Sequence, residues 1–298
     1  MVVAMNGWNF REDDSIADGL HAVRLLGGGL RYEAYLAWHD DLRTLVVVKL
    51  VRPELVTDAG ALDGLRREVQ AVRGLAHPML PRGFGAELEG DCPHLVLEFV
   101  EGPRLSTLIR RYAVSIEQVL PLALNLCAVL HYLGRERIVH LDVKPRNIIM
   151  GQEPQLIDLS IARRLDELGE LTGPVGTDAY MAPEQCDPTL FGDLGPAADM
   201  WGLGATLHEA LTGQRAFPDD GARFPQLRND PWPLPRRVPE PLAAAVNACL
   251  ERRPEDRATA QELARTLEPL VDALPAPRLG RFRPSPKRRH DHQEVQWT

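Results

Sequence analysis

The chain has 298 residues, of which 44% are hydrophobic and 26% are charged, and its formal net charge is −8. This composition is typical of a globular protein that is long enough to bury a core without disulfide or metal staples. The acidic balance excludes a nucleic-acid binder whose whole surface is basic.

The cysteines and the apolar segments indicate the compartment. The four cysteines lie far apart and show no CxxC or other metal-ligand spacing, which is typical of reduced thiols in the cytoplasm. Residues 1–10 lack the basic start and apolar run of a secretory signal. The most apolar stretch, residues 116–133, is interrupted by polar side chains and predicts a buried core helix. We therefore expect a cytoplasmic protein without a membrane span.

Strand patterns come first along the chain and helix patterns follow. Over residues 21–97, short apolar runs such as residues 45–48 and 95–97 lie between turn residues, with one amphipathic helix near residues 62–74. Helix patterns then predict helices over residues 116–133, 197–211, 241–251 and 259–270. This order predicts an α+β fold with a small β-rich lobe and a larger α-rich lobe.

Residues 275–298 differ in kind from the rest of the chain. They hold four prolines and six basic side chains with little apolar material to bury, so we expect a disordered basic tail. The tail is interpreted either as a docking arm for acidic partners, nucleic acid or anionic lipid, or as a solvated terminus. Apart from this tail, nothing in the sequence favours a nucleic-acid partner.

Two segments of the first lobe carry residues suited to holding phosphates. Leu26 is followed by three glycines, which let backbone N–H groups approach phosphate oxygens, although such a run also occurs in tight turns. Lys49 ends an apolar strand and is either a solvated edge charge or a phosphate ligand. Glu68, on the predicted helix, can supply the carboxylate that would hold Lys49 in place.

Two segments of the second lobe supply acid–base and metal chemistry. In residues 138–149 a polar loop lies between β-branched runs, so that Asp142 can accept a hydroxyl proton and Lys144 can neutralise a moving phosphate. Asn147 offers an amide oxygen to a metal. Asp158 follows another apolar strand and is a natural magnesium ligand, or else a turn-capping aspartate.

Together and in this order, these segments resemble the signature set of the eukaryotic-type (Hanks-type) protein kinase family over about residues 20–270, with most similarity to bacterial serine/threonine kinases. Further matching segments are Gly176-Thr177-Asp178-Ala179-Tyr180-Met181-Ala182-Pro183-Glu184, Asp199-Met200-Trp201-Gly202-Leu203-Gly204, and Arg257 as the expected partner of Glu184.

The resemblance implies a two-lobed protein-kinase-like fold with ATP bound between the lobes. It divides the chain into an N-terminal extension (residues 1–19), a kinase domain (20–271) and the tail, and the domain into an N-lobe (20–97), a hinge (98–102) and a C-lobe (103–271). It implies transfer of the γ-phosphoryl group to protein serine or threonine hydroxyls. Lys144 and Thr177 resemble the serine/threonine branch.

The resemblance also implies roles for named residues. The catalytic set is Asp142, Lys144, Lys49 and Glu68. The metal ligands, for Mg²⁺ or alternatively Mn²⁺, are Asn147 and Asp158. The nucleotide-binding set is Leu26, Gly27, Gly29, Ala34, Val47, Lys49, Glu98, Val100 and Ile149.

Four residues depart from the family pattern. Tyr32 stands at the third glycine position, and Val47 replaces an alanine above the adenine. Ser160 replaces the glycine after Asp158-Leu159, where we expect it to disfavour a positive φ. Leu141 replaces the arginine that pairs with a phosphorylated activation loop. We therefore predict that phosphorylation of that loop, for example on Thr172, is not required for activity.

Two alternatives remain open on the sequence. The atypical Tyr32, Leu141 and Ser160 fit a pseudokinase that binds nucleotide as an interaction module. A small-molecule phosphotransferase of related fold is the other alternative. The complete polar set argues against the first, and the Ala-Pro-Glu segment with Arg257 argues against the second.

Overall fold

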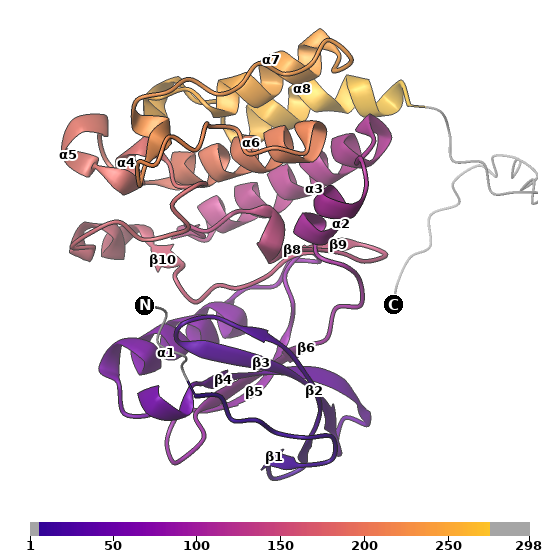
Figure 1. Ribbon diagram of the computed structural model, residues 1–298, viewed down its shortest axis with the longest axis vertical. Helices are drawn as coiled ribbons and strands as arrows, with labels where there is room; N and C mark the ends of the chain where they lie inside the picture. The colour runs from indigo at the N-terminus through magenta and orange to yellow at the C-terminus, as the bar shows by residue number, and fades with distance from the viewer. Residues whose placement is uncertain (1–5, 275–298) are drawn as a thin grey trace, which may run out of the picture.

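The computed structural model describes residues 6–274, so the basic tail lies outside the described residues. A β-sheet with one long helix forms one lobe, and helices form the other (Figure 1). This arrangement confirms the predicted α+β, two-lobed fold.

The N-lobe is built on a six-stranded antiparallel sheet with the order β1-β2-β3-β4-β6-β5. Its strands are β1 (Ser15–Ala17), β2 (Leu20–Gly28), β3 (Tyr32–His39), β4 (Thr44–Val51), β5 (Gly83–Glu87) and β6 (His94–Glu98). Side chains alternate between the two faces of a strand. On β4, Val46 and Val48 are therefore buried on one face, whereas Val47 and Lys49 lie on the other.

Helix α1 (Ala59–Gly74) packs on the face of the sheet that carries Lys49. Asp58 caps the helix by accepting a 2.7 Å hydrogen bond from the Ala61 N–H, which satisfies one of the free donors of the first turn. Leu65 and Val69 are buried against the sheet, and Glu68 is buried on the same helix.

Part of the segment that the sequence left outside the kinase domain, residues 8–10, packs on the opposite face of the sheet, whereas β1 forms an edge strand. The Trp8 indole donates a 2.8 Å hydrogen bond to the Val51 carbonyl, and the ring stacks on Phe10 at 5.6 Å. Phe10 in turn meets Tyr35 edge to face. These aromatic side chains cover part of the buried cluster that Val46 and Val48 also belong to.

The C-lobe consists of helices around one large apolar core. They are α2 (Leu105–Arg111), α3 (Ile116–Arg135), α4 (Pro183–Cys186), α5 (Pro188–Phe191), α6 (Pro196–Thr212), α7 (Glu240–Cys249) and α8 (Ala260–Asp272). Short 3₁₀ helices are η1 (Pro53–Leu55, in the N-lobe), η2 (Pro145–Asn147), η3 (Leu165–Glu170), η4 (Pro225–Leu227) and η5 (Pro254–Asp256). Two small antiparallel pairs join β7 (Ile138–Val139) to β10 (Arg163–Arg164), and β8 (Ile148–Met150) to β9 (Pro154–Leu156).

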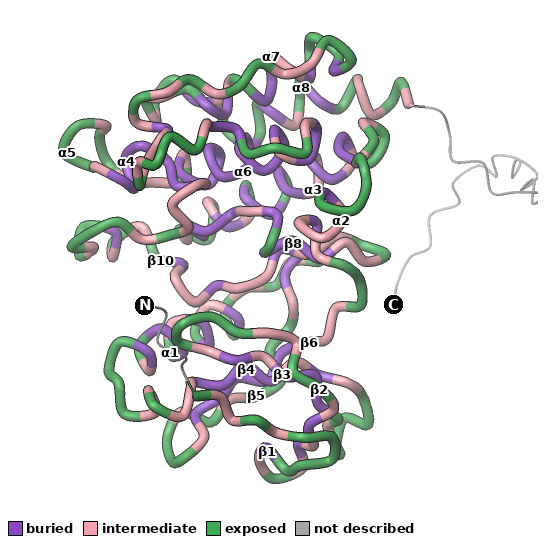
Figure 2. The backbone as a smooth tube through the Cα atoms, viewed as in Figure 1, coloured by how far each residue is buried: buried purple, intermediate pink, exposed green. Residues whose placement is uncertain are grey.

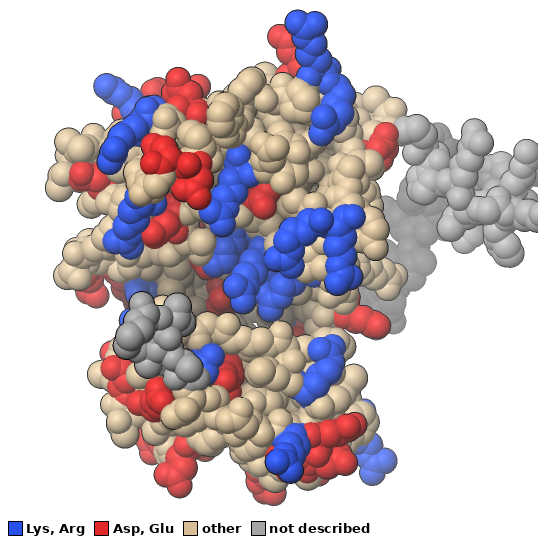
Figure 3. All heavy atoms as spheres, in the orientation of Figure 1, with Lys and Arg blue, Asp and Glu red and all other residues tan. Residues whose placement is uncertain are grey.

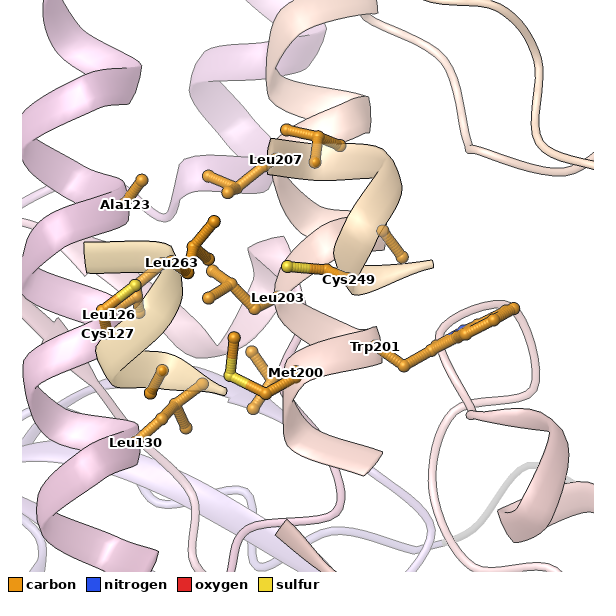
Figure 4. Close-up of a cluster of buried hydrophobic side chains, with 14 of the residues drawn as sticks. Ala123, Leu126, Cys127, Leu130, Met200, Trp201, Leu203, Leu207, Cys249 and Leu263 are labelled. Atoms are coloured by element: carbon orange, nitrogen blue, oxygen red, sulfur yellow. The ribbon is translucent and has the colours of Figure 1, made fainter. Parts of the chain in front are cut away.

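Helix α6 forms the centre of this lobe and is buried on nearly every side (Figure 2). Leucines and cysteines of α3, α6, α7 and α8 meet there (Figure 4). A Cβ on Gly204 would lie 2.7 Å from the Cβ of Cys249, so glycine is what allows α6 and α7 to approach this closely.

Helix α3 is, among the described residues, the one helix long and apolar enough by composition to cross a membrane. The helix is continuous, but Pro121 and several polar residues interrupt its run of apolar side chains. These apolar side chains contact α6 and α8 inside the core. We therefore assign α3 as a core helix of the C-lobe, as predicted.

Candidate active site

The polar loop between β7 and β8 lies where the sequence predicted it. Hydrogen bonds to α6 hold it in place. Asp199, in the first turn of α6, accepts hydrogen bonds from the N–H groups of His140 (2.7 Å) and Leu141 (2.8 Å). Burial raises the pKa of Asp199, and the two donors act in the opposite sense because they stabilise the carboxylate. Leu141 has φ = +66°, a costly conformation for a leucine, so these bonds hold a strained turn.

The carboxylate of Asp142 accepts hydrogen bonds from three side chains. Lys144 Nζ lies 2.5 Å from Oδ2, Asn147 Nδ2 lies 3.0 Å from the same oxygen, and Thr177 Oγ1 donates to Oδ1 at 2.7 Å. Lys144 also contacts Thr177 Oγ1 at 2.5 Å. Thr177 lies 35 residues away in the chain, so the structure joins the predicted loop to the Gly176-Thr177 segment.

Lys49 joins the two lobes through a pair of carboxylates. Its ammonium lies 2.6 Å from Glu68 Oε2 on α1 and 2.7 Å from Asp158 Oδ1 in the C-lobe. Burial alone would lower the pKa of Lys49, but the two carboxylates outweigh it and raise that pKa above its ordinary value. Burial likewise opposes ionisation of Asp158, yet Lys49 and a bond from Ser160 hold its pKa well below the usual range. The lysine is therefore cationic and Asp158 anionic at neutral pH.

The two predicted metal ligands present suitable oxygens. Both hydrogen bonds to Asp158 end on Oδ1, which leaves Oδ2 without a partner among residues 6–274. Asn147 uses its amide nitrogen twice on Asp142, so its Oδ1 is likewise free within the described chain. One carboxylate and one amide oxygen are hard donors of the kind that Mg²⁺ accepts beside phosphate oxygens.

Ser160 stands where the family pattern has a glycine. The positive φ of this segment falls on Asp158 (+74°), whereas Ser160 does not have one. The absence of a positive φ at Ser160 agrees with the expected preference of serine, and no glycine is needed at this position. The Ser160 hydroxyl donates a 2.8 Å hydrogen bond to Asp158 Oδ1 and adds to the groups that hold this carboxylate.

Tyr32 lies at the first residue of β3, with its side chain directed at α1. Its hydroxyl donates a 2.7 Å hydrogen bond to the Ala61 carbonyl, and the Lys49 ammonium lies 4.9 Å from its ring centroid. Its own carbonyl accepts the Gly29 N–H at 2.9 Å and closes the glycine turn. Tyr32 therefore contacts the glycine turn, Lys49 and α1 together. Sequence reasoning missed its contact with α1 because Ala61 is distant in the chain.

Several of the predicted nucleotide-binding residues lie on adjoining strands of the N-lobe sheet. Register places Ala34 opposite both Gly27 and Lys49, and Val47 opposite both Leu36 and Leu97. The apolar side chains expected to line an adenine pocket are partly accessible or at the limit of burial: Leu26, Ala34, Val47 and Ile149.

In the hinge itself, the Glu98 N–H is already used by the Arg82 carbonyl at 2.8 Å. The Val100 N–H has no hydrogen-bond partner within the described part of the chain. A donor is therefore available at Val100 for an adenine ring, whereas Glu98 has only its carbonyl left to offer.

The predicted pair of Arg257 and Glu184 is formed and fully enclosed. The guanidinium contacts both carboxylate oxygens, at 2.6 and 2.7 Å, and both side chains are 0% exposed. The neighbouring Gln185 donates to the carbonyls of Leu141 and Val175. Gln185 thereby links this segment to the polar loop between β7 and β8, a role that no local pattern in the sequence indicated.

The chain belongs to the protein kinase domain family, whose match covers residues 20–267. It is 31% identical over 243 residues to the serine/threonine-protein kinase PkaA of Streptomyces coelicolor, a match that spans 77% of this chain and 44% of the relative. It is 30% identical over 259 residues to PknB of Mycolicibacterium smegmatis (81% and 41%) and 30% over 276 residues to PknA of Mycobacterium tuberculosis (88% and 62%). The aligned region is thus less than two thirds of the length of each of these curated relatives.

Proposed function

We propose that the protein is a serine/threonine protein kinase that transfers the γ-phosphoryl group of ATP to protein hydroxyls. The observation that carries the proposal is the assembled set of charges: Lys49 between Glu68 and Asp158, and Asp142 within hydrogen-bond distance of Lys144 and Thr177. Family membership and relatives named serine/threonine-protein kinases support it. Four free cysteines, three of them buried, fit action in the reducing cytoplasm.

The residues have distinct roles in this proposal. ATP supplies the phosphoryl group, and bound Mg²⁺, or alternatively Mn²⁺, neutralises its charge. Asp142 orients the acceptor hydroxyl and accepts its proton, while Lys144 lies beside it to stabilise the transferred charge. Lys49 holds the phosphates of ATP, and Glu68 keeps Lys49 in position. Asp158 and Asn147 supply the oxygen ligands for the metal.

We also propose that the kinase acts without phosphorylation of its activation loop. Leu141 is 3% exposed in the C-lobe core and offers no charge to a phosphate, and Thr172 is exposed. The contacts of Lys144, Thr177 and Asp142 are already in place. A Thr172→Ala variant should therefore keep most of its turnover, and loss of nearly all activity would contradict this part of the proposal.

The test is phosphotransfer with Mg²⁺-ATP or Mn²⁺-ATP, onto the protein itself and onto one acidic and one basic generic protein, with sites read by mass spectrometry. Asp142→Asn should lower the rate by about 10²-fold or more. Asp41→Asn, an exposed aspartate in the β3–β4 turn, is the matched control and should not change the rate.

Thermal unfolding with nucleotide separates binding from chemistry. Asp142→Asn should retain stabilisation by Mg²⁺-ATP, whereas Asp158→Ala should lose the metal-dependent part. Stabilisation of the wild type by ATP with no phosphoserine or phosphothreonine on any acceptor would contradict the proposal and favour a pseudokinase.

A further inference from the structure

The side chain of Arg104 contacts the backbone of Arg146 in the polar loop between β7 and β8, the proposed catalytic loop. Arg104 immediately precedes α2, and Arg146 lies in η2 of the catalytic loop. The Arg104 guanidinium donates a 2.7 Å hydrogen bond to the Arg146 carbonyl, and Arg104 is also bridged to Ile149 on β8. The segment after the hinge is thereby fixed against the catalytic loop.

This pair lies close to the proposed chemistry. Arg146 directly precedes Asn147, whose amide donates to Asp142. Burial is the main reason that the pKa of Arg104 is lowered, the charge of Arg146 adds to it, and the carboxylate of Asp158 opposes both. The charges of Arg146 and Asp158 thus both act on the Arg104 guanidinium, in opposite senses.

Four arginines in this region have no carboxylate partner among the described residues. Within residues 6–274, no carboxylate forms a salt bridge with Arg104 or Arg146, nor with Arg110 and Arg111, which are exposed at the end of α2. Lys and Arg side chains gather over this part of the C-lobe, beside the recess between the lobes (Figure 3). A cation that is partly withdrawn from water and has no anion beside it is unfavourable, and the half-buried Arg104 is in this position.

We infer that Arg104 and Arg146 bind an anionic side chain of the protein substrate, either a carboxylate or a phosphorylated residue, close to the acceptor hydroxyl. This inference rests on the proposed kinase function and gives it a substrate class. The nucleotide is not the expected occupant, because its phosphates have Lys49 and the glycine turn as their own ligands. Guanidinium groups suit the planar oxygens of carboxylate and phosphate.

The experiment uses the full chain and a set of neutral serine peptides. One glutamate is placed in turn at each of four positions on either side of the serine. We expect glutamate at one or two of these positions to raise kcat/KM by about tenfold over alanine. Phosphoserine at the preferred position tests the second source of the charge: a larger gain than with glutamate indicates substrates that are phosphorylated beforehand.

Charge reversal tests whether these arginines cause the preference. The variant Arg104→Glu/Arg146→Glu should favour arginine over glutamate at the same position, while Arg104→Ala/Arg146→Ala, the milder change, should merely lose the preference. Arg265→Glu, an exposed arginine on α8, is the matched control and should keep the wild-type preference. Thermal unfolding of each variant verifies that it is folded.

The outcomes separate the two proposals. Equal rates on all peptides, with phosphotransfer present, would overturn the substrate inference and leave the kinase proposal standing. A glutamate preference that survives both double variants would also overturn it. Absence of transfer to every peptide and to the protein itself would overturn the kinase proposal, and this inference with it.

Discussion

The hydroxyl of Tyr32 donates a 2.7 Å hydrogen bond to the carbonyl of Ala61 and so joins the glycine turn to the first turn of α1. The same helix carries Glu68, which holds Lys49, and the Lys49 ammonium lies over the Tyr32 ring. A side chain at the third glycine position thus contacts three parts of the proposed nucleotide site. Its hydroxyl adds a polar contact to the apolar packing that holds α1 on the sheet.

Replacing Tyr32 with phenylalanine should loosen α1 and keep the ring under Lys49. The lost hydrogen bond is worth about 1 kcal/mol, so we expect a several-fold loss in kcat/KM for ATP and faster amide exchange over the first turns of α1. Tyr32→Gly, which also removes the ring, should cost more. Amide exchange in α8 is the internal control, because no contact of Tyr32 reaches that helix.

Gly64 gives a sharper test of the same contact. A Cβ on Gly64 would overlap the Tyr32 hydroxyl oxygen, whereas the ring carbon that bears it is 3.5 Å away. Gly64→Ala should therefore be damaging in the wild type. In the Tyr32→Phe background it should be tolerated, with a gain in helix propensity of up to about 1 kcal/mol. Additive effects in a double-mutant cycle would show that the methyl group introduced at position 64 does not meet the Tyr32 hydroxyl.

The enclosed pair of Arg257 and Glu184 should be costly to break from one side. Arg257→Leu leaves a buried carboxylate without its partner, and we expect a loss of about 3–5 kcal/mol in the free energy of unfolding by urea. Arg257→Leu/Glu184→Leu should lose less than the single variant, because no charge is left behind. A double variant at least as unstable as Arg257→Leu would contradict this account.

The buried thiols predict how stability depends on alkaline pH. Burial raises the thiol pKa of Cys127 and Cys186 to about 12, above the usual value of about 8.5 that applies to the unfolded chain. Above pH 8.5 the unfolded chain therefore loses thiol protons that the native protein keeps. Their contribution to stability is fully present below about pH 8.5 and is lost as pH rises toward 12.

Urea unfolding between pH 8 and pH 10.5 measures that loss, and Cys127→Ala should make the decline in the free energy of unfolding less steep.

The reactivity of the thiols tests their burial directly. At pH 8 the native protein should react slowly with an aromatic disulfide reagent, with partly exposed Cys92 first. Urea should expose all four thiols. Rapid reaction of three or four thiols in the native protein would contradict the burial described above.

The segment before β2 should contribute to N-lobe stability. Trp8→Ala removes the hydrogen bond to Val51 and the stacking on Phe10, and we expect a loss of about 2 kcal/mol. Trp38→Ala, at a tryptophan of β3 that is 40% exposed, is the matched control and should cost less. Equal effects would mean that residues 6–19 are an appendage rather than part of the folded lobe.

Much of the fold followed from the sequence because its signals are local. Apolar periodicity predicted the helices over 116–133 and 197–211, and the structure extends each by only one or two residues, to Ile116–Arg135 and Pro196–Thr212. The polar loop with Asp142 was predicted between two strands and lies between β7 and β8. Spacing could identify these features because each is fixed by residues close together in the chain.

The contacts that complete the site were decided by tertiary structure. Asp199 holds the Leu141 turn from 58 residues away, Thr177 reaches Asp142 across 35, and Tyr32 reaches Ala61 across 29. Residues 6–19 carry no strong local pattern, yet pack on the sheet because aromatic rings meet an apolar face there. The sequence by itself proposed the charged residues of the candidate site, and the structure brings them together. Their partners depended on surfaces that exist only after the chain has folded, since burial and long-range hydrogen bonds have no local signature.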